Sequence, residues 1–122
     1  MSGIRSYKDL LIWQRAIDLV VHVYNVLKKF PSDERFVLGA QIRRCAVSVP
    51  SNIAEGQARK HTAEFRQFLY ISLGSLAELD TQIIISEKLG YLSSDESSLF
   101  NEEMTELRKM IFGVIKKLPT NH

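Results

Sequence analysis

Four long stretches of helical periodicity, separated by short corners, constrain this 122-residue sequence more than any other feature. In each stretch apolar residues recur every three or four positions, the spacing that lines one face of an α-helix. The stretches cover about residues 7–29, 33 or 34–55, 63–89 and 94–118. Rods of this length joined by short connections must lie beside one another with neighbours antiparallel. The sequence therefore predicts an all-α fold: a single domain over residues 1–122, built as an antiparallel up-down-up-down four-helix bundle.

The apolar positions also predict which face of each helix is buried. The predicted stripes are Leu10, Trp13, Ile17, Val20, Tyr24 and Leu27 in the first helix; Leu38, Ile42, Cys45, Val49 and Ile53 in the second; Phe65, Phe68 or Leu69, Ser72, Leu76, Leu79 and Ile83 in the third; and Phe100, Met104, Leu107, Ile111, Val114 and Leu118 in the fourth. The predicted N-terminal caps are Ser6 with Asp9, Thr62, and Ser93 with Glu96 as a capping box. The predicted C-terminal ends are Gly56 and Gly90.

The third helix carries more apolar residues than one buried face requires. Ile71, Leu73, Ile84 and Ile85 all lie off its main stripe. A helix that is apolar over more than one stripe is buried on more than one side. Gly74 and Ser75 would let another backbone approach closely. These features predict a homo-oligomer.

The second helix contains Pro50, which cannot donate to the carbonyl of Ala46 and is expected to kink the helix. A polar line passes through this point: Gln41, Arg44, Ser48, Ser51 or Asn52, Glu55 and Arg59. Two interpretations stay open: a kink that only bends the helix around the core, with a solvated outer face, or an interface or binding groove. For the second, the candidate residues are Gln41, Ser48, Pro50, Asn52 and Glu55, together with Gly74 and Ser75.

The net charge of +2 is unevenly distributed along the chain. Residues 41–66 hold five Lys/Arg against two Asp/Glu, whereas residues 67–122 hold five against eight. A basic middle beside an acidic C-terminal third indicates a dipolar molecule. The candidate phosphate contacts are the five basic residues of the middle segment: Arg43, Arg44, Arg59, Lys60 and Arg66.

Several classes of protein are disfavoured. A single cysteine permits no internal disulfide, and no apolar run follows the charges of the first residues, so we expect a cytoplasmic protein without a membrane span. The chain has no Glu-x-x-His pair and no phosphate-loop or dinucleotide glycine motif, so we expect no metal and no cofactor. Cys45 lies on the apolar stripe and is expected to be a buried structural thiol.

One catalytic pattern remains as an alternative. Arg15 and His22 have the Arg-x6-His spacing of some helical ribonucleases, and two helical turns place both side chains near one face. His22 would act as an acid or base toward a ribose hydroxyl, with Arg15 steadying the phosphate. Exposed polar residues explain the same spacing, and we predict that the chain has no catalytic residues.

A set of residues along nearly the whole chain carries a family resemblance. They are Trp13-Gln14, Phe30-Pro31, Glu34, Phe36, Leu38, Gln41, Arg43-Arg44, Ser48, Pro50, "NIAEG" at 52–56, Arg59, Phe68-Leu69, Gly74-Ser75 and Glu78-Leu79. On these the chain resembles the bacterial four-helix-bundle proteins named after the intervening sequences of 23S ribosomal RNA. It is more distantly similar to the accessory proteins of diversity-generating retroelements. The resemblance implies ring-shaped homopentamers and, for the retroelement relatives, contact with nucleic acid and a reverse transcriptase. Cys45 and Val47 depart from the small residues expected there.

The leading functional hypothesis is a non-enzymatic oligomeric bundle that binds RNA or a nucleoprotein partner. The alternative is a protein-binding scaffold that makes no nucleic-acid contact. The ribonuclease that uses Arg15 and His22 ranks third.

Overall fold

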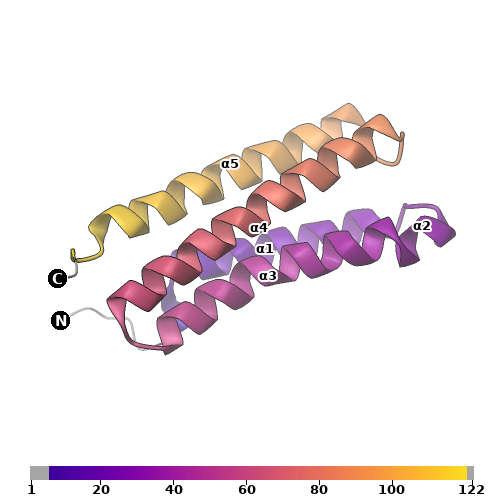
Figure 1. Ribbon diagram of the computed structural model, residues 1–122. Helices are drawn as coiled ribbons and strands as arrows, with labels where there is room; N and C mark the ends of the chain where they lie inside the picture. The colour runs from indigo at the N-terminus through magenta and orange to yellow at the C-terminus, as the bar shows by residue number, and fades with distance from the viewer. Residues whose placement is uncertain (1–5, 121–122) are drawn as a thin grey trace.

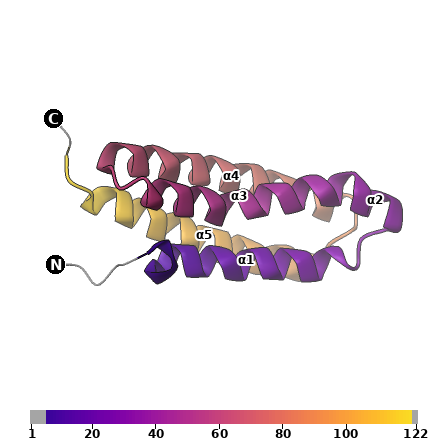
Figure 2. The same ribbon diagram turned by 90° about the horizontal axis from the view of Figure 1, so that it is seen from below.

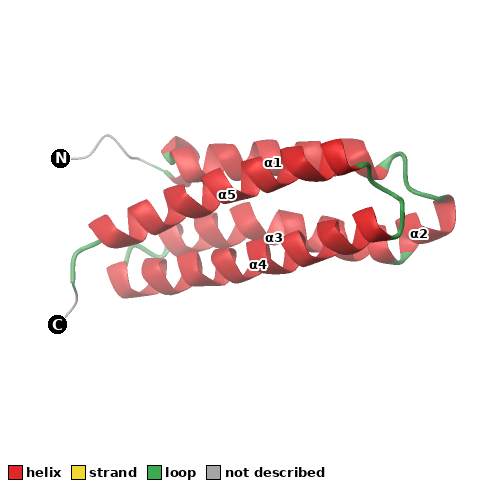
Figure 3. Cartoon of the chain, turned by 90° about the horizontal axis from the view of Figure 1, so that it is seen from above, coloured by secondary structure: helices red, strands yellow, loops and turns green. Residues whose placement is uncertain are grey.

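The computed structural model describes residues 6–120, and every secondary-structure element within them is a helix (Figure 3). A 3₁₀ turn, η1 (Tyr7–Asp9), precedes α1 (Leu11–Leu27), α2 (Ser32–Phe36), α3 (Leu38–Ala58), α4 (Thr62–Lys88) and α5 (Ser94–Lys117). The expected all-α fold is confirmed. The second predicted helix is instead two elements, because Val37 leaves the helical region with φ −106° and ψ −84°.

The four long helices form two layers, with α3 and α4 in one and α1 and α5 in the other (Figure 2). The start of α1, the corner between α3 and α4 and the end of α5 lie at one end of the bundle (Figure 1). A hydrogen bond of 2.6 Å from Arg66 to the carbonyl of Pro119 joins two of these segments. At the opposite end, the Tyr91 hydroxyl donates to Glu34 over 2.9 Å, which joins α2 to the corner between α4 and α5.

The predicted buried stripes of α3 and α4 are confirmed almost residue by residue. Ile42, Ile53, Leu76 and Leu79 are completely buried. In α5 the stripe is buried as far as Ile111, and its last two members are only partly buried. Of the two alternatives in α4, Leu69 is the fully buried residue.

The predicted stripe of the first helix is confirmed at its two ends, where Leu10 and Leu27 are buried, and is off by about one residue between them. The buried residues are Ile12, Ala16, Leu19, Val23, Val26 and Leu27, whereas Trp13, Ile17 and Val20 are only partly buried and Tyr24 is 44% exposed. Most of α1 is apolar, so two adjacent faces fit the helical spacing equally well. The small Ala16 marks the correct face, since it lets a neighbouring helix approach.

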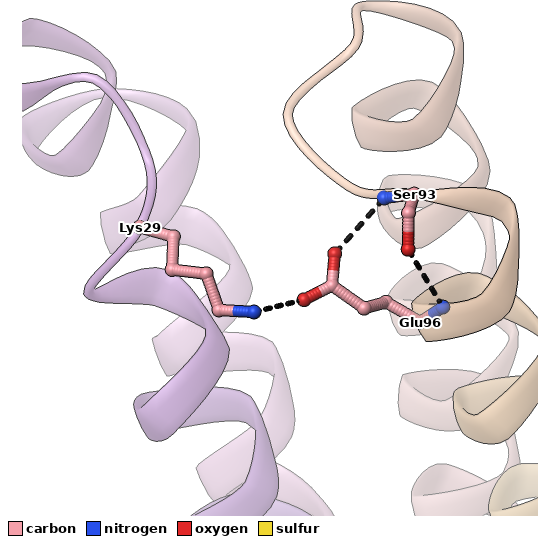
Figure 4. Close-up of polar contacts among 3 residues, drawn as sticks. All are labelled: Lys29, Ser93 and Glu96. Atoms are coloured by element: carbon pink, nitrogen blue, oxygen red, sulfur yellow. Dashed lines mark hydrogen bonds and ion pairs between the residues drawn. The ribbon is translucent and has the colours of Figure 1, made fainter.

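Two helix ends at the far end of the bundle are as predicted. Gly90 has φ +84°, and the amides of Gly90 and Tyr91 donate to the carbonyls of Glu87 and Ser86, so the last turn of α4 is closed. Ser93 and Glu96 form the capping box of α5, with bonds of 2.9 and 3.1 Å. The Lys29 ammonium pairs with the same Glu96 carboxylate, so the box also ties the end of α1 to the start of α5 (Figure 4).

Three other predicted ends are wrong. The Ser6–Asp9 capping box is present, but it caps η1, and α1 begins only after the extended Leu10. Gly56 does not end α3, which continues to Ala58, and Lys60 takes the left-handed conformation with φ 62°. Thr62 is the first residue of α4, whereas the N-cap position is His61, whose side chain makes no capping hydrogen bond.

Within residues 6–120, α4 alone is long and apolar enough to cross a membrane by length and composition. The core helix of a soluble bundle meets the same criterion.

Candidate functional site

A polar groove of about 540 Å³ lies between α3 and α4. The Ser48 hydroxyl donates to the Cys45 carbonyl over 2.6 Å and is hydrogen-bonded to the Ser75 hydroxyl over 2.7 Å, and the Cys45 thiol donates to the Ser75 carbonyl over 3.0 Å. Gln41, Arg44 and Glu78 complete the lining. Part of the predicted polar line, with Ser75, is therefore brought together in this groove.

The Cys45 thiol is unsuited to nucleophilic chemistry. The residue is buried, and burial raises the pKa of the thiol to about 12, with a further contribution from the nearby Glu78 carboxylate. A nucleophilic cysteine needs its thiolate form. Cys45 is protonated at neutral pH and packs as a small apolar side chain, as predicted.

Side chains of the polar line bind the backbone around Pro50. The Asn52 amide donates to the Ser48 carbonyl over 2.7 Å, and the Ser72 hydroxyl of α4 donates to the Val49 carbonyl over 3.0 Å. Pro50 itself is buried inside α3. Part of the polar line thus stabilises the helix through the proline, and Glu55, one turn beyond, pairs with Arg59 over 2.9 Å.

The outer surface of α4 exposes several large apolar side chains, with the exposed Glu78, Thr81 and Lys88 between and beside them. We call it the α4 face: Tyr70, Ile71, Gly74, Ile84, Ile85 and Leu89, with Phe112 of α5 edge-on to Tyr70. Its large side chains are 42–55% exposed. A Cβ on Gly74 would have no atom within 4 Å, so nothing in the chain itself requires glycine there. Ser75, in contrast, lies in the groove, and Leu73 packs against the core.

The five cations predicted to contact phosphate do not form one patch. Arg43 donates to the Arg35 carbonyl over 2.9 Å and lies 5.9 Å from the ring centroid of Tyr24, whereas Arg44 lines the groove. Arg59 is already engaged by Glu55, whose hydrogen bond raises the pKa of the guanidinium, and it covers the ring of Phe68. Arg43 and Arg44 lie in the first half of α3, away from Arg59, Lys60 and Arg66 at the α3–α4 corner.

The fold gathers positive charge at the end of the bundle that contains the α3–α4 corner. This basic end carries six cations: Lys8, Arg59, Lys60, Arg66, Lys116 and Lys117. Three carboxylates accompany them, namely Asp9, Glu55 and Glu64. The rest of residues 6–120 has nine Lys/Arg against eleven Asp/Glu. Sequence reasoning missed Lys8, Lys116 and Lys117, although the alternating direction of the helices would have placed them beside Lys60.

A cleft of about 220 Å³ opens at the basic end. Leu10 and Phe65 form apolar walls, and Gln57, Lys60, His61 and Thr62 supply polar groups. Gly56 contributes bare backbone. The adjoining η1 turn is held against α1 by the Tyr7 and Trp13 rings, which meet edge-on with centroids 5.5 Å apart.

Arg15 and His22 both face carboxylates of α5. The Arg15 guanidinium pairs with Glu106 over 2.8 Å, and His22 Nδ1 contacts Glu103. Carboxylates in these positions repel a phosphate, so the geometry does not favour the ribonuclease alternative. No three His, Cys, Asp or Glu side chains in the described part of the chain are grouped to hold a metal ion.

Comparison with known proteins agrees with this fold. No curated protein matches the sequence. A crystal structure from Bacteroides thetaiotaomicron, described as a protein of unknown function from the S23 ribosomal protein family, matches with a TM-score of 0.81 and 23% identity over 88% of this chain and 96% of that chain. The family model of the 23S rRNA-intervening sequence proteins matches residues 8–113. The chain belongs to the 23S rRNA-intervening sequence protein family.

Proposed function

We propose that this chain is a non-enzymatic, homo-oligomeric bundle of the cytoplasm that binds RNA or a nucleoprotein. Its proposed subunits are up-down-up-down bundles in which α3 bends at Pro50. We propose five subunits in a ring, the assembly that the family resemblance implies. The observation that carries the proposal is the α4 face, an apolar surface that the chain's own fold leaves in water. Large apolar side chains exposed in groups on one surface are a feature of interaction sites.

Two features support self-association through this face. It contains aromatic and branched aliphatic side chains, which are typical of interface centres. Gly74 lies among them although glycine in a helix costs roughly 1 kcal/mol relative to alanine. A second backbone approaching Gly74 would explain that cost.

The RNA component rests on charge and on the family. The net charge of the whole chain is +2, and the cations are concentrated at the basic end. An oligomer repeats this end in every subunit, so individually weak phosphate contacts add. The family is named for proteins associated with an intervening sequence of ribosomal RNA.

Sedimentation velocity of the native protein tests the assembly. Ile85→Lys, on the α4 face, is expected to produce monomers, because it places a charge in the apolar interface. Leu99→Lys is the matched control, since Leu99 is 54% exposed on α5 outside the α4 face. A monomeric wild-type protein at high concentration would overturn the proposal.

Native purification followed by sequencing of bound RNA and identification of bound protein tests the partner. Co-purifying RNA supports the proposal. A stoichiometric protein that stays bound after nuclease treatment, with no RNA, would support the scaffold alternative instead.

A further inference from the structure

We propose that the basic end binds single-stranded RNA, with Lys60, Lys116 and Lys117 on its phosphates and one base in the cleft beside Phe65. The inference deepens the proposed function and rests on it. Of the five cations predicted from the sequence it keeps Lys60, and it adds Lys116 and Lys117, so the surface is built from the α3–α4 corner and the end of α5.

The first support is the distribution of charge. Within residues 6–120, the basic end has three more cations than carboxylates, whereas the remainder has two more carboxylates than cations. A polyanion is therefore attracted to this end and repelled elsewhere.

The second support is the availability of the lysines. Lys60, Lys116 and Lys117 are exposed, and their side chains make no ion pair or hydrogen bond with residues 6–120. Arg15 and Lys29, in contrast, are neutralised by carboxylates of α5. The three lysines can therefore contact phosphate without giving up an existing partner.

The third support is the conformation of Lys60. Its φ of 62° makes it the one non-glycine residue of the described chain with positive φ. Glycine adopts this conformation without the steric penalty of a side chain. The described contacts do not require a lysine there, and Lys60 is one of the residues that line the cleft.

The cleft distinguishes a single strand from other polyanions. Surfaces that bind single strands combine cations along the backbone with aromatic walls on which bases stack. Phe65 and Leu10 supply an apolar wall, and Gln57 and Thr62 supply groups for hydrogen bonds to a base edge. A duplex cannot use this cleft, because its bases are already stacked, and an acidic peptide would use the lysines alone.

The test measures binding of an end-labelled, mixed-sequence single-stranded RNA of roughly 20 nucleotides, long enough to cover a site. The same sequence as a duplex is the second probe. The basic-end variant is Lys60→Gly with Lys116→Gln and Lys117→Gln; Lys60→Gly also removes the backbone strain, so it does not threaten folding. The control is Lys28→Gln with Arg35→Gln and Lys88→Gln, three exposed cations near helix C-termini at the opposite end.

We expect the wild-type protein to prefer the single strand. The basic-end variant should lose roughly tenfold to hundredfold in affinity at about 0.1 M salt, and its log–log salt slope should become shallower by about two. The control variant should bind within about twofold of wild type, since its cations lie far from the site.

Other outcomes separate this inference from the proposed function. If the basic-end variant binds RNA like wild type, or if the duplex binds equally well, the inference is wrong and RNA binding stands. If the wild-type protein binds neither probe and purifies without RNA, both fail. If the variant instead loses a co-purifying protein while RNA binding is unchanged, the basic end is a protein-docking surface and the inference is wrong.

Discussion

A Cβ atom on Gly56 of α3 would lie 2.6 Å from the Cβ of Phe68 on α4. The bare backbone of Gly56 therefore packs directly against the Phe68 side chain, with the Phe65 ring beside it. Because the obstructing atom is attached directly to the backbone of α4, it cannot move aside as the end of a flexible chain can. The α3–α4 corner and the cleft beside it depend on this contact.

Gly56→Ala is expected to destabilise the fold by about 1–3 kcal/mol, because overpacking exceeds the gain of up to about 1 kcal/mol in helix propensity. Urea denaturation measures the change. A urea midpoint equal to or above that of wild type would contradict this expectation, because it would show that α4 moves away from the added methyl group without cost.

Gly74→Ala is the matched substitution in an open position. Its Cβ has no neighbour within 4 Å, so we expect each subunit to gain roughly 0.5–1 kcal/mol from helix propensity. If another subunit packs on Gly74, the methyl group weakens association at the same time. Denaturation of the dilute protein and sedimentation of the concentrated protein measure the two effects; unaltered association would remove Gly74 from the interface.

Cys45 is expected to resist thiol reagents until the protein unfolds. Burial raises the pKa of the thiol to about 12, against an ordinary 9.0, so the folded protein keeps the thiol protonated. At a pH between these two pKa values, the Cys45 thiol is deprotonated in the unfolded chain and protonated in the folded chain. The free energy of unfolding therefore falls as pH rises above about 9. Thermal melts of wild type and Cys45→Ala over this range should diverge; parallel curves would contradict the raised pKa.

Glu96→Gln is expected to destabilise the protein at neutral pH and to have less effect in acid. The Lys29 ammonium, followed by the Ser93 amide, lowers the pKa of the Glu96 carboxyl below its ordinary 4.5. The stabilisation is present above 4.5 and is lost as pH falls through the lowered pKa of the folded state. Urea denaturation at neutral and acid pH measures it. Ser93→Ala, which removes the other half of the box, should cost about 1 kcal/mol.

His22→Ala is expected to leave RNA as intact as wild type does, because neither protein cleaves it. The stacked His22 and Phe100 rings, with centroids 3.9 Å apart, give the histidine a packing role worth about 0.5–1.5 kcal/mol. Incubation with labelled RNA tests cleavage, and denaturation tests stability. Cleavage by wild type that disappears in the variant would establish the ribonuclease alternative.

Much of the fold follows from the sequence. In α3 and α5 the apolar residues lie on one stripe, and the corner between α4 and α5 has strong end signals. Leu76, Leu79 and Ile83 could be placed in the core from spacing alone, and Gly90 and Ser93 mark a corner with residue types that few other positions favour. In α1 the same method failed, since apolar residues cover two adjacent faces and only contacts with other helices choose between them.

The candidate site was less predictable because it depends on contacts between distant segments. Arg59 looked available from its position, yet Glu55 and Glu64 engage it. Lys116 looked like a feature of an acidic C-terminal third, yet it belongs to the last turn of α5, which lies at the same end of the bundle as the α3–α4 corner (Figure 1). The net charge of a segment of the sequence therefore differs from the net charge of the surface to which that segment contributes.

The edge-on contact of Tyr7 with Trp13 has a practical consequence. Trp13 is the only tryptophan of the chain, so its emission comes from a single place, the junction of η1 and α1 next to the cleft. Intrinsic fluorescence thus gives an optical signal from the end of the molecule where we place the RNA strand, without a dye attached to the protein.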